Sequence, residues 1–127
     1  MEVFNVYRGR MAETIYQAAL ACEMSDRSIP FEREKQCSVF YKHHKLDINY
    51  RPDFLCYGNI IVELKSPDEI LKEHRFQVFN YMRLLKTPVG LLVNFGENSL
   101  HVERYLFDEE HNNCCIVDAS LSPVYRN

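Results

Sequence analysis

The amino-acid sequence predicts an α/β fold, in which helices flank a mixed central β-sheet. Residues 11–25 place apolar side chains at helical spacing, and their many alanines favour a helix. A second helix is predicted over residues 66–86, because a serine that can cap a helix is followed by a proline, which suits the first helical position. The apolar runs 60–65 and 89–95 have the length and composition of buried strands.

The remaining strands lie before, between and after these segments. Residues 36–42 are predicted as a strand, and a short polar turn leads into a second strand over residues 46–57. Pro52 interrupts that strand, which indicates an edge or a bulge, because proline donates no ladder hydrogen bond. A last strand is predicted over residues 100–107, so the predicted order is α-β-β-β-α-β-β. Weak patterning leaves residues 108–127 as a C-terminal tail in which we expect no regular element.

Composition and charge narrow the class of protein. The 127 residues accommodate a single domain over 1–127, with a core at about 4–107. With 46% hydrophobic and 26% charged residues, no membrane-length apolar run and no signal-like start, the sequence predicts a cytoplasmic, globular protein that does not enter a membrane. A net charge of −3 excludes a stable non-specific coat for DNA, which would be more basic.

The five cysteines are interpreted as free, buried thiols. Their number is odd, and three of them fall inside predicted helix or strand. The adjacent pair Cys114-Cys115 has no second pair to complete a zinc site, and the spacing of an iron–sulfur cluster is missing.

An acidic pair and a lysine form the candidate chemical centre. Glu63 and Lys65 are two residues apart on a predicted strand, so they face the same side, and alone they are typical of an ion pair at a sheet rim. Asp53 lies ten residues before Glu63, and a hairpin turning at Gly58-Asn59 brings the two acids together. Adjacent carboxylates repel unless a cation lies between them, and Mg²⁺ suits such oxygen ligands while leaving waters for substrate phosphates.

Other polar residues allow two interpretations each. Gln77 and Tyr81 share a helical stripe with His74, and they either face a cleft or lie buried and hydrogen-bonded; His74 is expected to be structural. Tyr16 is expected in the core, although it lies three residues from Glu13 and could flank the site.

Two basic segments are either solvated or clamps for phosphate. The first comprises Arg8 and Arg10, and the second is the turn from Lys42 to Lys45. The adjacent histidines of that turn, His43 and His44, point to opposite faces of a strand and do not suit one shared metal ion.

Taken in order, these motifs resemble a known superfamily. Pro52-Asp53 followed by Glu63-Leu64-Lys65 resembles the PD-(D/E)xK nuclease motif. Together with an E-x-x-Y at Glu13 and a Q-x-x-x-Y at Gln77, the order is similar to that of the RecB and lambda-exonuclease branch. More narrowly, residues 4–107 resemble the GxxExxY protein family, through stretches such as AETIYQAALACEM, IIVELKS and HRFQVFNYMRLL, although Arg10 stands where that family has its glycine.

The resemblance implies a restriction-endonuclease-like core and a set of roles. Glu13, Asp53 and Glu63, with the Leu64 carbonyl, would be ligands of Mg²⁺ or Mn²⁺, and Lys65 would position the attacking water or stabilise the charged transition state. Substrate contacts are expected from four further side chains, Gln77, Tyr81, Lys42 and Lys45. The implied function is metal-dependent hydrolysis of phosphodiester bonds, with DNA as the expected substrate. The alternative is a catalytically silent module that binds nucleic acid or protein, and exposed edge strands would permit a homodimer.

Overall fold

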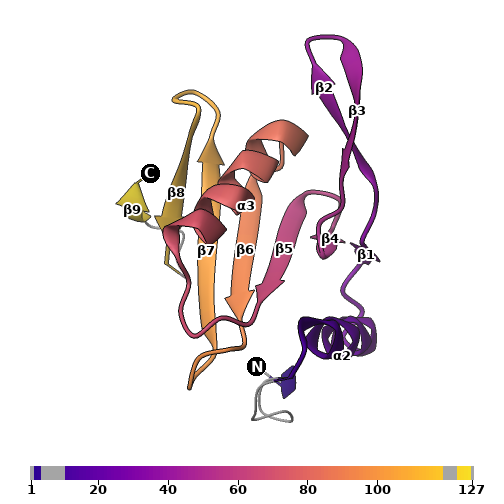
Figure 1. Ribbon diagram of the computed structural model, residues 1–127, viewed down its shortest axis with the longest axis vertical. Helices are drawn as coiled ribbons and strands as arrows, with labels where there is room; N and C mark the ends of the chain where they lie inside the picture. The colour runs from indigo at the N-terminus through magenta and orange to yellow at the C-terminus, as the bar shows by residue number, and fades with distance from the viewer. Residues whose placement is uncertain (1, 4–10, 119–122, 127) are drawn as a thin grey trace.

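The computed structural model describes residues 2, 3, 11–118 and 123–126, and it confirms the predicted α/β class (Figure 1). A mixed sheet is combined with two helices of 14 residues each. The elements follow in the order α2 (Glu13–Asp26), β1 (Phe31–Arg33), β2 (Cys37–Tyr41), β3 (His44–Tyr50), β4 (Phe54–Cys56), β5 (Ile60–Lys65), α3 (Lys72–Leu85), β6 (Val89–Asn94), β7 (His101–Asp108), β8 (Asn113–Val117) and β9 (Pro123–Arg126).

Seven strands form the main sheet, in the order β1-β4-β5-β6-β7-β8-β9. Only the β5–β6 pair is parallel, and its crossover connection contains α3, as a parallel pair requires. Among the described strands, β2 and β3 pair only with each other. We call these two strands and the turn between them the β2–β3 ribbon; Figure 1 shows the ribbon standing away from the sheet beyond β4.

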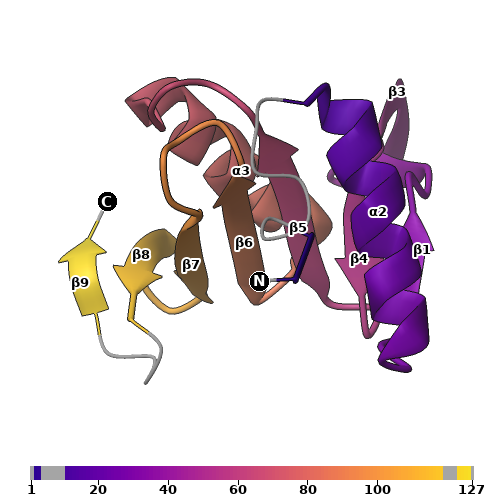
Figure 2. The same ribbon diagram turned by 90° about the horizontal axis from the view of Figure 1, so that it is seen from below.

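The two helices cover opposite faces of the sheet because side chains alternate along each strand. On β5, Val62 and Leu64 pack with the buried residues of α2, whereas Ile61 packs with those of α3. Figure 2 shows α3 over β6 and α2 beside β4 and β5. The face of β5 that carries Ile61 also carries Glu63 and Lys65, so both charged side chains belong to the α3 face.

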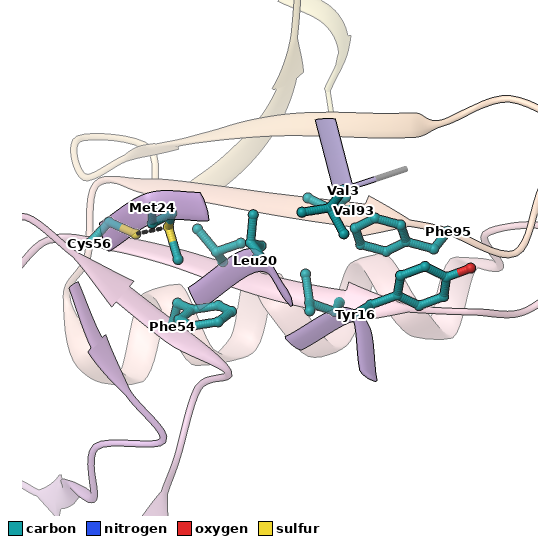
Figure 3. Close-up of a cluster of buried hydrophobic side chains, with 10 residues drawn as sticks. Val3, Tyr16, Leu20, Met24, Phe54, Cys56, Val93 and Phe95 are labelled. Carbon is teal, nitrogen blue, oxygen red and sulfur yellow. Dashed lines mark hydrogen bonds between the residues drawn. The ribbon is translucent and has the colours of Figure 1, made fainter. Parts of the chain in front are cut away.

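The core beneath α2 combines aliphatic side chains with aromatic and sulfur-containing ones (Figure 3). The Tyr16 ring stacks on that of Phe95, with centroids 4.2 Å apart and planes at 12°. The Cys56 thiol lies 3.8 Å from the Met24 sulfur. Tyr16 is almost fully buried, so the core interpretation of this residue is confirmed. Burial of each such ring contributes about 2 kcal/mol, which fixes α2 against the sheet.

The predicted strand 46–57 is in fact two strands. It is divided at Pro52 into β3, which belongs to the ribbon, and β4, which belongs to the main sheet. Pro52 has no N–H to donate, so the ladder stops there and the chain passes from one sheet to the other. A short strand, β1, pairs with β4 and was not predicted.

The predicted start of the second helix is wrong. The helix begins at Lys72 rather than after Ser66, and its capping contact is the Leu71 N–H donating to His74 Nδ1 at 2.9 Å. The structural interpretation of His74 is thereby confirmed.

The segment before α3 is held against the end of β6 instead of being helical. Asn94 Nδ2 donates to the Pro67 carbonyl at 3.1 Å, and the Phe95 N–H donates to the Lys65 carbonyl at 2.9 Å. At Gly96 a Cβ atom would lie only 2.2 Å from the Ser66 carbonyl oxygen, so glycine permits this close approach. These tertiary contacts outweigh the local helix-start signal.

The C-terminal region also differs from the prediction. Strand β8 pairs with β7, and β9 pairs with β8, where no element was expected. Cys114 is fully buried in the core beneath α3. All five cysteines are free, as predicted, but the predicted burial is wrong for Cys22, which lies exposed on α2. Neither described helix is long and apolar enough to cross a membrane.

Candidate active site

Asp53 and Glu63 lie side by side, as the hairpin spacing predicts. The β4–β5 register pairs Phe54 with Val62, and this places the preceding Asp53 opposite Glu63. The Asp53 N–H donates to Glu63 Oε1 at 3.1 Å, and the Leu64 N–H donates to Asp53 Oδ2 at 2.8 Å. Each acid is therefore fixed by the backbone of the other strand.

An amide from α2 fixes the second oxygen of Asp53. Gln17 Nε2 donates to Asp53 Oδ1 at 3.0 Å, and Gln17 Oε1 accepts from Arg33 Nε at 2.9 Å. Only 8% of Gln17 is exposed. Sequence reasoning missed Gln17 and Arg33, although Gln17 lies four residues after Glu13 and therefore on the same side of the helix.

Glu63 is held by a tyrosine that sequence reasoning also missed. The Tyr50 hydroxyl donates to Glu63 Oε1, and the Tyr50 ring stacks on that of Tyr81 with centroids 3.4 Å apart. Tyr50 comes from the base of the β2–β3 ribbon, while Tyr81 comes from α3. No local pattern signals this contact, because it depends on how the ribbon leans on α3.

The charge on Glu63 is costly in this environment. Burial, followed by the negative charge of Asp53, raises the pKa of Glu63 to about 7, against the opposing effects of Tyr50, the Asp53 N–H and Lys65. Burial, followed by the charge of Glu63, also raises the pKa of the Tyr50 hydroxyl, so this hydroxyl stays a donor. A cation at the acid pair would relieve the repulsion between the two carboxylates.

Lys65 faces the polar stripe of α3. Its Nζ donates to Gln77 Oε1 at 3.1 Å, and Gln77 Nε2 lies 3.4 Å from the Tyr81 hydroxyl oxygen, to which it donates. Gln77 is exposed, so its interpretation as a buried residue is wrong, whereas Tyr81 is half-buried against the core beneath α3. Gln77 and Tyr81, both on α3, therefore orient the ammonium group of Lys65.

Glu13 lines a hollow together with Asp53, one member of the acid pair. This hollow has a volume of about 260 Å³ and is lined by Glu13, Thr14, Gln17, Arg33, Glu34, Asp53 and Leu64. The exposed Glu13 side chain accepts a hydrogen bond from Ser66 Oγ at 3.3 Å. Among the described residues, Glu13, Asp53 and Glu63 are not a group whose ligand atoms all lie within 4.8 Å of one another. Glu13 thus faces the hollow without joining the acid pair directly.

The donor set fits a hard divalent cation. Carboxylate oxygens from Asp53 and Glu63, with the Leu64 residue and Glu13 at the hollow, match the oxygen ligands that Mg²⁺ and Mn²⁺ take. Within the described residues, the one tight group of three potential ligands lies elsewhere, at Asp108, Glu110 and His111 on the β7–β8 turn. The latter group is largely exposed, and His111 Nδ1 is 2.6 Å from Asp108 Oδ2.

The basic turn lies at the end of the β2–β3 ribbon that faces away from the acid pair. Lys42, His43, His44 and Lys45 are all exposed at the tip of the ribbon, at the end opposite to Tyr50. The structure therefore does not bring Lys42 and Lys45 together with the acid pair. Arg8 and Arg10 lie outside the described residues.

Comparison with solved structures supports the fold. The chain is similar to the protein in "Crystal structure of SSO0001", with a TM-score of 0.57 and 18% sequence identity. The match covers 72% of this chain and 49% of that one, so the matched region is about half of the length of that protein. A likeness at this identity concerns the fold alone. No curated protein matches the chain.

A family model gives the decisive comparison. The model of the PD-(D/E)XK nuclease superfamily matches residues 1–105. The match extends over most of the chain and includes Asp53, Glu63 and Lys65, which the fold brings to one end of the β4–β5 hairpin. The chain belongs to the PD-(D/E)XK nuclease superfamily.

Proposed function

We propose that this protein is a metal-dependent nuclease that hydrolyses phosphodiester bonds of DNA. The observation that carries the proposal is the interlocked pair Asp53–Glu63, with Lys65 two residues after Glu63 on β5 and with Asp53 lining an open hollow. Mg²⁺ or Mn²⁺ would be held by Asp53, Glu63 and the Leu64 carbonyl, with Glu13 contributing from the same hollow. A bound divalent cation lowers the pKa of a coordinated water and offsets charge on the phosphate.

The protein's own groups have separate tasks in this proposal. Gln17 and the Leu64 N–H hold Asp53 in one orientation, and Tyr50 does the same for Glu63. Lys65, directed by Gln77, stabilises the negative charge that develops on the phosphate oxygens. Because these groups are positioned before substrate arrives, little reorganisation is needed during the reaction.

A second candidate function is a binding module without catalysis. It is favoured by one observation: Glu13 is not grouped closely with Asp53 and Glu63, and Glu13 is already bonded to Ser66. In this case the scaffold binds nucleic acid or a protein, and the acid pair holds at most a structural ion. Membership of the GxxExxY family, a single domain over 1–127 and a homodimer stay predictions.

The first experiment separates these candidates. Purified protein is incubated with linear, circular and single-stranded DNA in Mg²⁺ or Mn²⁺, and products are followed on gels. We expect cleavage that EDTA abolishes and that Lys65→Ala lowers by about 100-fold. Lys86→Ala is the matched control, because Lys86 is an exposed lysine at the C-terminal end of α3. Cleavage that persists in EDTA, or in Lys65→Ala, contradicts the nuclease proposal.

A metal titration completes the comparison. Isothermal titration with Mn²⁺ should show one site that is lost in Asp53→Asn. If wild-type protein binds Mn²⁺ and DNA but cleaves no DNA in any of the three forms, the binding module is the correct function.

A further inference from the structure

The β2–β3 ribbon exposes an unusual amount of apolar surface. Phe40 is 56% exposed, Tyr41 is 61% exposed and Ile48 is 64% exposed. In the main sheet, by contrast, the large apolar side chains are mostly buried. Because the ribbon pairs with no other strand, neither of its outer edges is covered by the main sheet (Figure 1). Apolar surface of this kind on a projecting arm indicates a ligand that covers it.

The charge of the ribbon is opposite to that of the chain. Residues 37–50 contain Lys42 and Lys45 against one acid, Asp47, which gives 2 − 1 = +1, and Arg51 follows directly, whereas the whole chain carries −3. Among the described residues, none of these three cations forms an ion pair within 4.0 Å. The ribbon thus offers unpaired positive charge to an anionic ligand.

The cations and the aromatic rings are interleaved. Lys42 Nζ lies 5.4 Å from the centroid of the Tyr41 ring, and Lys45 stands opposite Phe40 in the strand register. Rings flanked by ammonium groups match a chain that alternates flat bases with phosphates. An apolar protein partner would leave these cations desolvated and unpaired, which is costly.

The base of the ribbon is attached to the candidate active site. Tyr50 bonds to Glu63 and stacks on Tyr81, and Val39 is buried. From Tyr50 to His44 at the tip, β3 extends over seven residues, about 20 Å of extended chain. A strand lying along the ribbon would therefore lead directly to the acid pair.

We propose that the β2–β3 ribbon is a docking arm for single-stranded nucleic acid, which it guides toward Asp53 and Glu63. The inference rests on the proposed function and specifies its substrate. Phe40 and Tyr41 point to opposite faces of β2, so the ribbon offers an aromatic ring on each face. A flexible single strand exposes unpaired bases that can stack on either ring, whereas a duplex keeps its base faces stacked. The span of about 20 Å corresponds to roughly six stacked nucleotides, so a strand of four cannot reach both ends.

The experiment measures binding of fluorescently labelled oligothymidylates, dT4 and dT20, to the full chain in Ca²⁺, with each oligonucleotide checked for cleavage. We expect dT20 to bind at least tenfold more tightly than dT4. Phe40→Ala/Tyr41→Ala should weaken dT20 binding at least fivefold and leave dT4 almost unchanged. Lys42→Ala/Lys45→Ala should reduce the slope of log affinity against log salt by about 1.4.

A matched variant shows whether the loss of any exposed tyrosine and lysine, even outside the ribbon, weakens binding. Tyr57→Ala/Lys86→Ala removes a 60%-exposed tyrosine and an exposed lysine outside the ribbon, and it should bind dT20 like wild type. Circular dichroism checks that all variants fold, as expected for exposed positions. Equal losses in the ribbon and control variants overturn the proposal, as does tighter binding of a 20-base-pair duplex than of dT20.

The outcomes distinguish the docking arm from the nuclease. If wild-type protein cleaves DNA and the ribbon variants bind dT20 normally, the docking arm is wrong and the nuclease stands. If the ribbon variants lose binding but the wild type never cleaves, the docking arm stands and catalysis is wrong. If wild-type protein binds no nucleic acid, both proposals are overturned.

Discussion

At the scale of single residues, Glu63 sets the character of the site. This residue is only 8% exposed, and its carboxylate accepts a hydrogen bond from the backbone N–H of a second acid, Asp53. A buried acid in such a place favours its protonated form unless a cation is present. The free energy of unfolding of the metal-free protein should therefore change with pH.

The first prediction concerns this pH dependence. The pKa of Glu63 is about 7 in the folded state, above the ordinary value of 4.5. The folded state therefore binds the proton more tightly, so the stabilisation is fully present below about pH 4.5 and is lost as pH rises to about 7. The loss amounts to about 3 kcal/mol. Urea unfolding in EDTA at pH 5 and pH 8 should show it in wild type and not in Glu63→Gln.

A control and a contrary result are both available for this measurement. Adding Mn²⁺ at pH 8 should restore stability in wild type, because a ligand that binds only the folded state stabilises it. If wild type and Glu63→Gln lose stability in parallel between pH 5 and pH 8, Glu63 is not the titrating group.

Some of these residues were predictable and others were not. The proximity of Asp53 and Glu63 follows from one short turn, because a hairpin aligns residues at equal distances from its centre. The contact of Tyr50 with Glu63 depends on the path of the ribbon across α3, and no sequence period encodes that path. Gln17 is intermediate, since its place on the Glu13 side of the helix was visible but its partner was not.

At the scale of elements, α3 is tied to the sheet by a buried ion pair. Arg75 of α3 donates from Nε and Nη2 to Glu103 of β7, at 2.7 and 2.8 Å, and the Tyr105 hydroxyl donates to the same acid. Burial raises the pKa of Glu103, but the hydrogen bonds from Arg75 and Tyr105 and the charges of Arg75 and His101 outweigh it, so this pKa lies below its usual value. Glu103 therefore stays ionised under the helix.

Removing one partner of this pair should be costly. Arg75→Met removes the guanidinium group that donates two hydrogen bonds to Glu103, a residue only 8% exposed, and should lower the free energy of unfolding by about 3 kcal/mol. Arg75→Met/Glu103→Gln should recover most of that loss, because no unpaired charge remains. Chemical denaturation measures both. The matched control is Arg27→Met, whose exposed pair with Glu23 should contribute under about 1 kcal/mol.

An equal loss of stability in Arg75→Met and Arg27→Met would show that the ion pair does not hold α3.

The elements themselves were only partly predictable. Local signals found both helices and the paired strands β5 and β6, but the capping signal at Ser66 was misleading. The contacts of Pro67 with Asn94 and of Ser66 with Gly96 are tertiary, and they hold this segment outside the helix.

At the scale of the whole molecule, the sheet extends further than the sequence suggests. Cys114 and Cys115 are both buried although they are neighbours, so β8 is covered on both faces. A strand covered in this way shows no alternation, and this is why its segment was interpreted as a weakly patterned tail. The α/β class was predictable because it depends on helices and central strands with strong patterns.

Thiol labelling provides a test of this extended sheet. In the native protein we expect Cys22 to react quickly with a disulfide reagent, Cys37 more slowly, and the other three thiols hardly at all. Burial raises the pKa of Cys56 and raises that of Cys114 to about 11, which disfavours the reactive thiolate. All five should react in urea. Rapid native labelling of Cys114 or Cys115, located by mass spectrometry, would show that β8 does not pair with β7.

The close approach at Gly96 has a consequence for how the site can diverge. Because the backbone of Ser66 and Pro67 lies directly against Gly96, the main chain that follows Lys65 has no room for a side chain beneath it. Outward-facing side chains of the segment after Lys65 can therefore vary. A side chain added at Gly96, by contrast, would displace the segment and with it the lysine. A change of substrate is then achieved more readily by substitutions in the wall of the hollow that α2 forms.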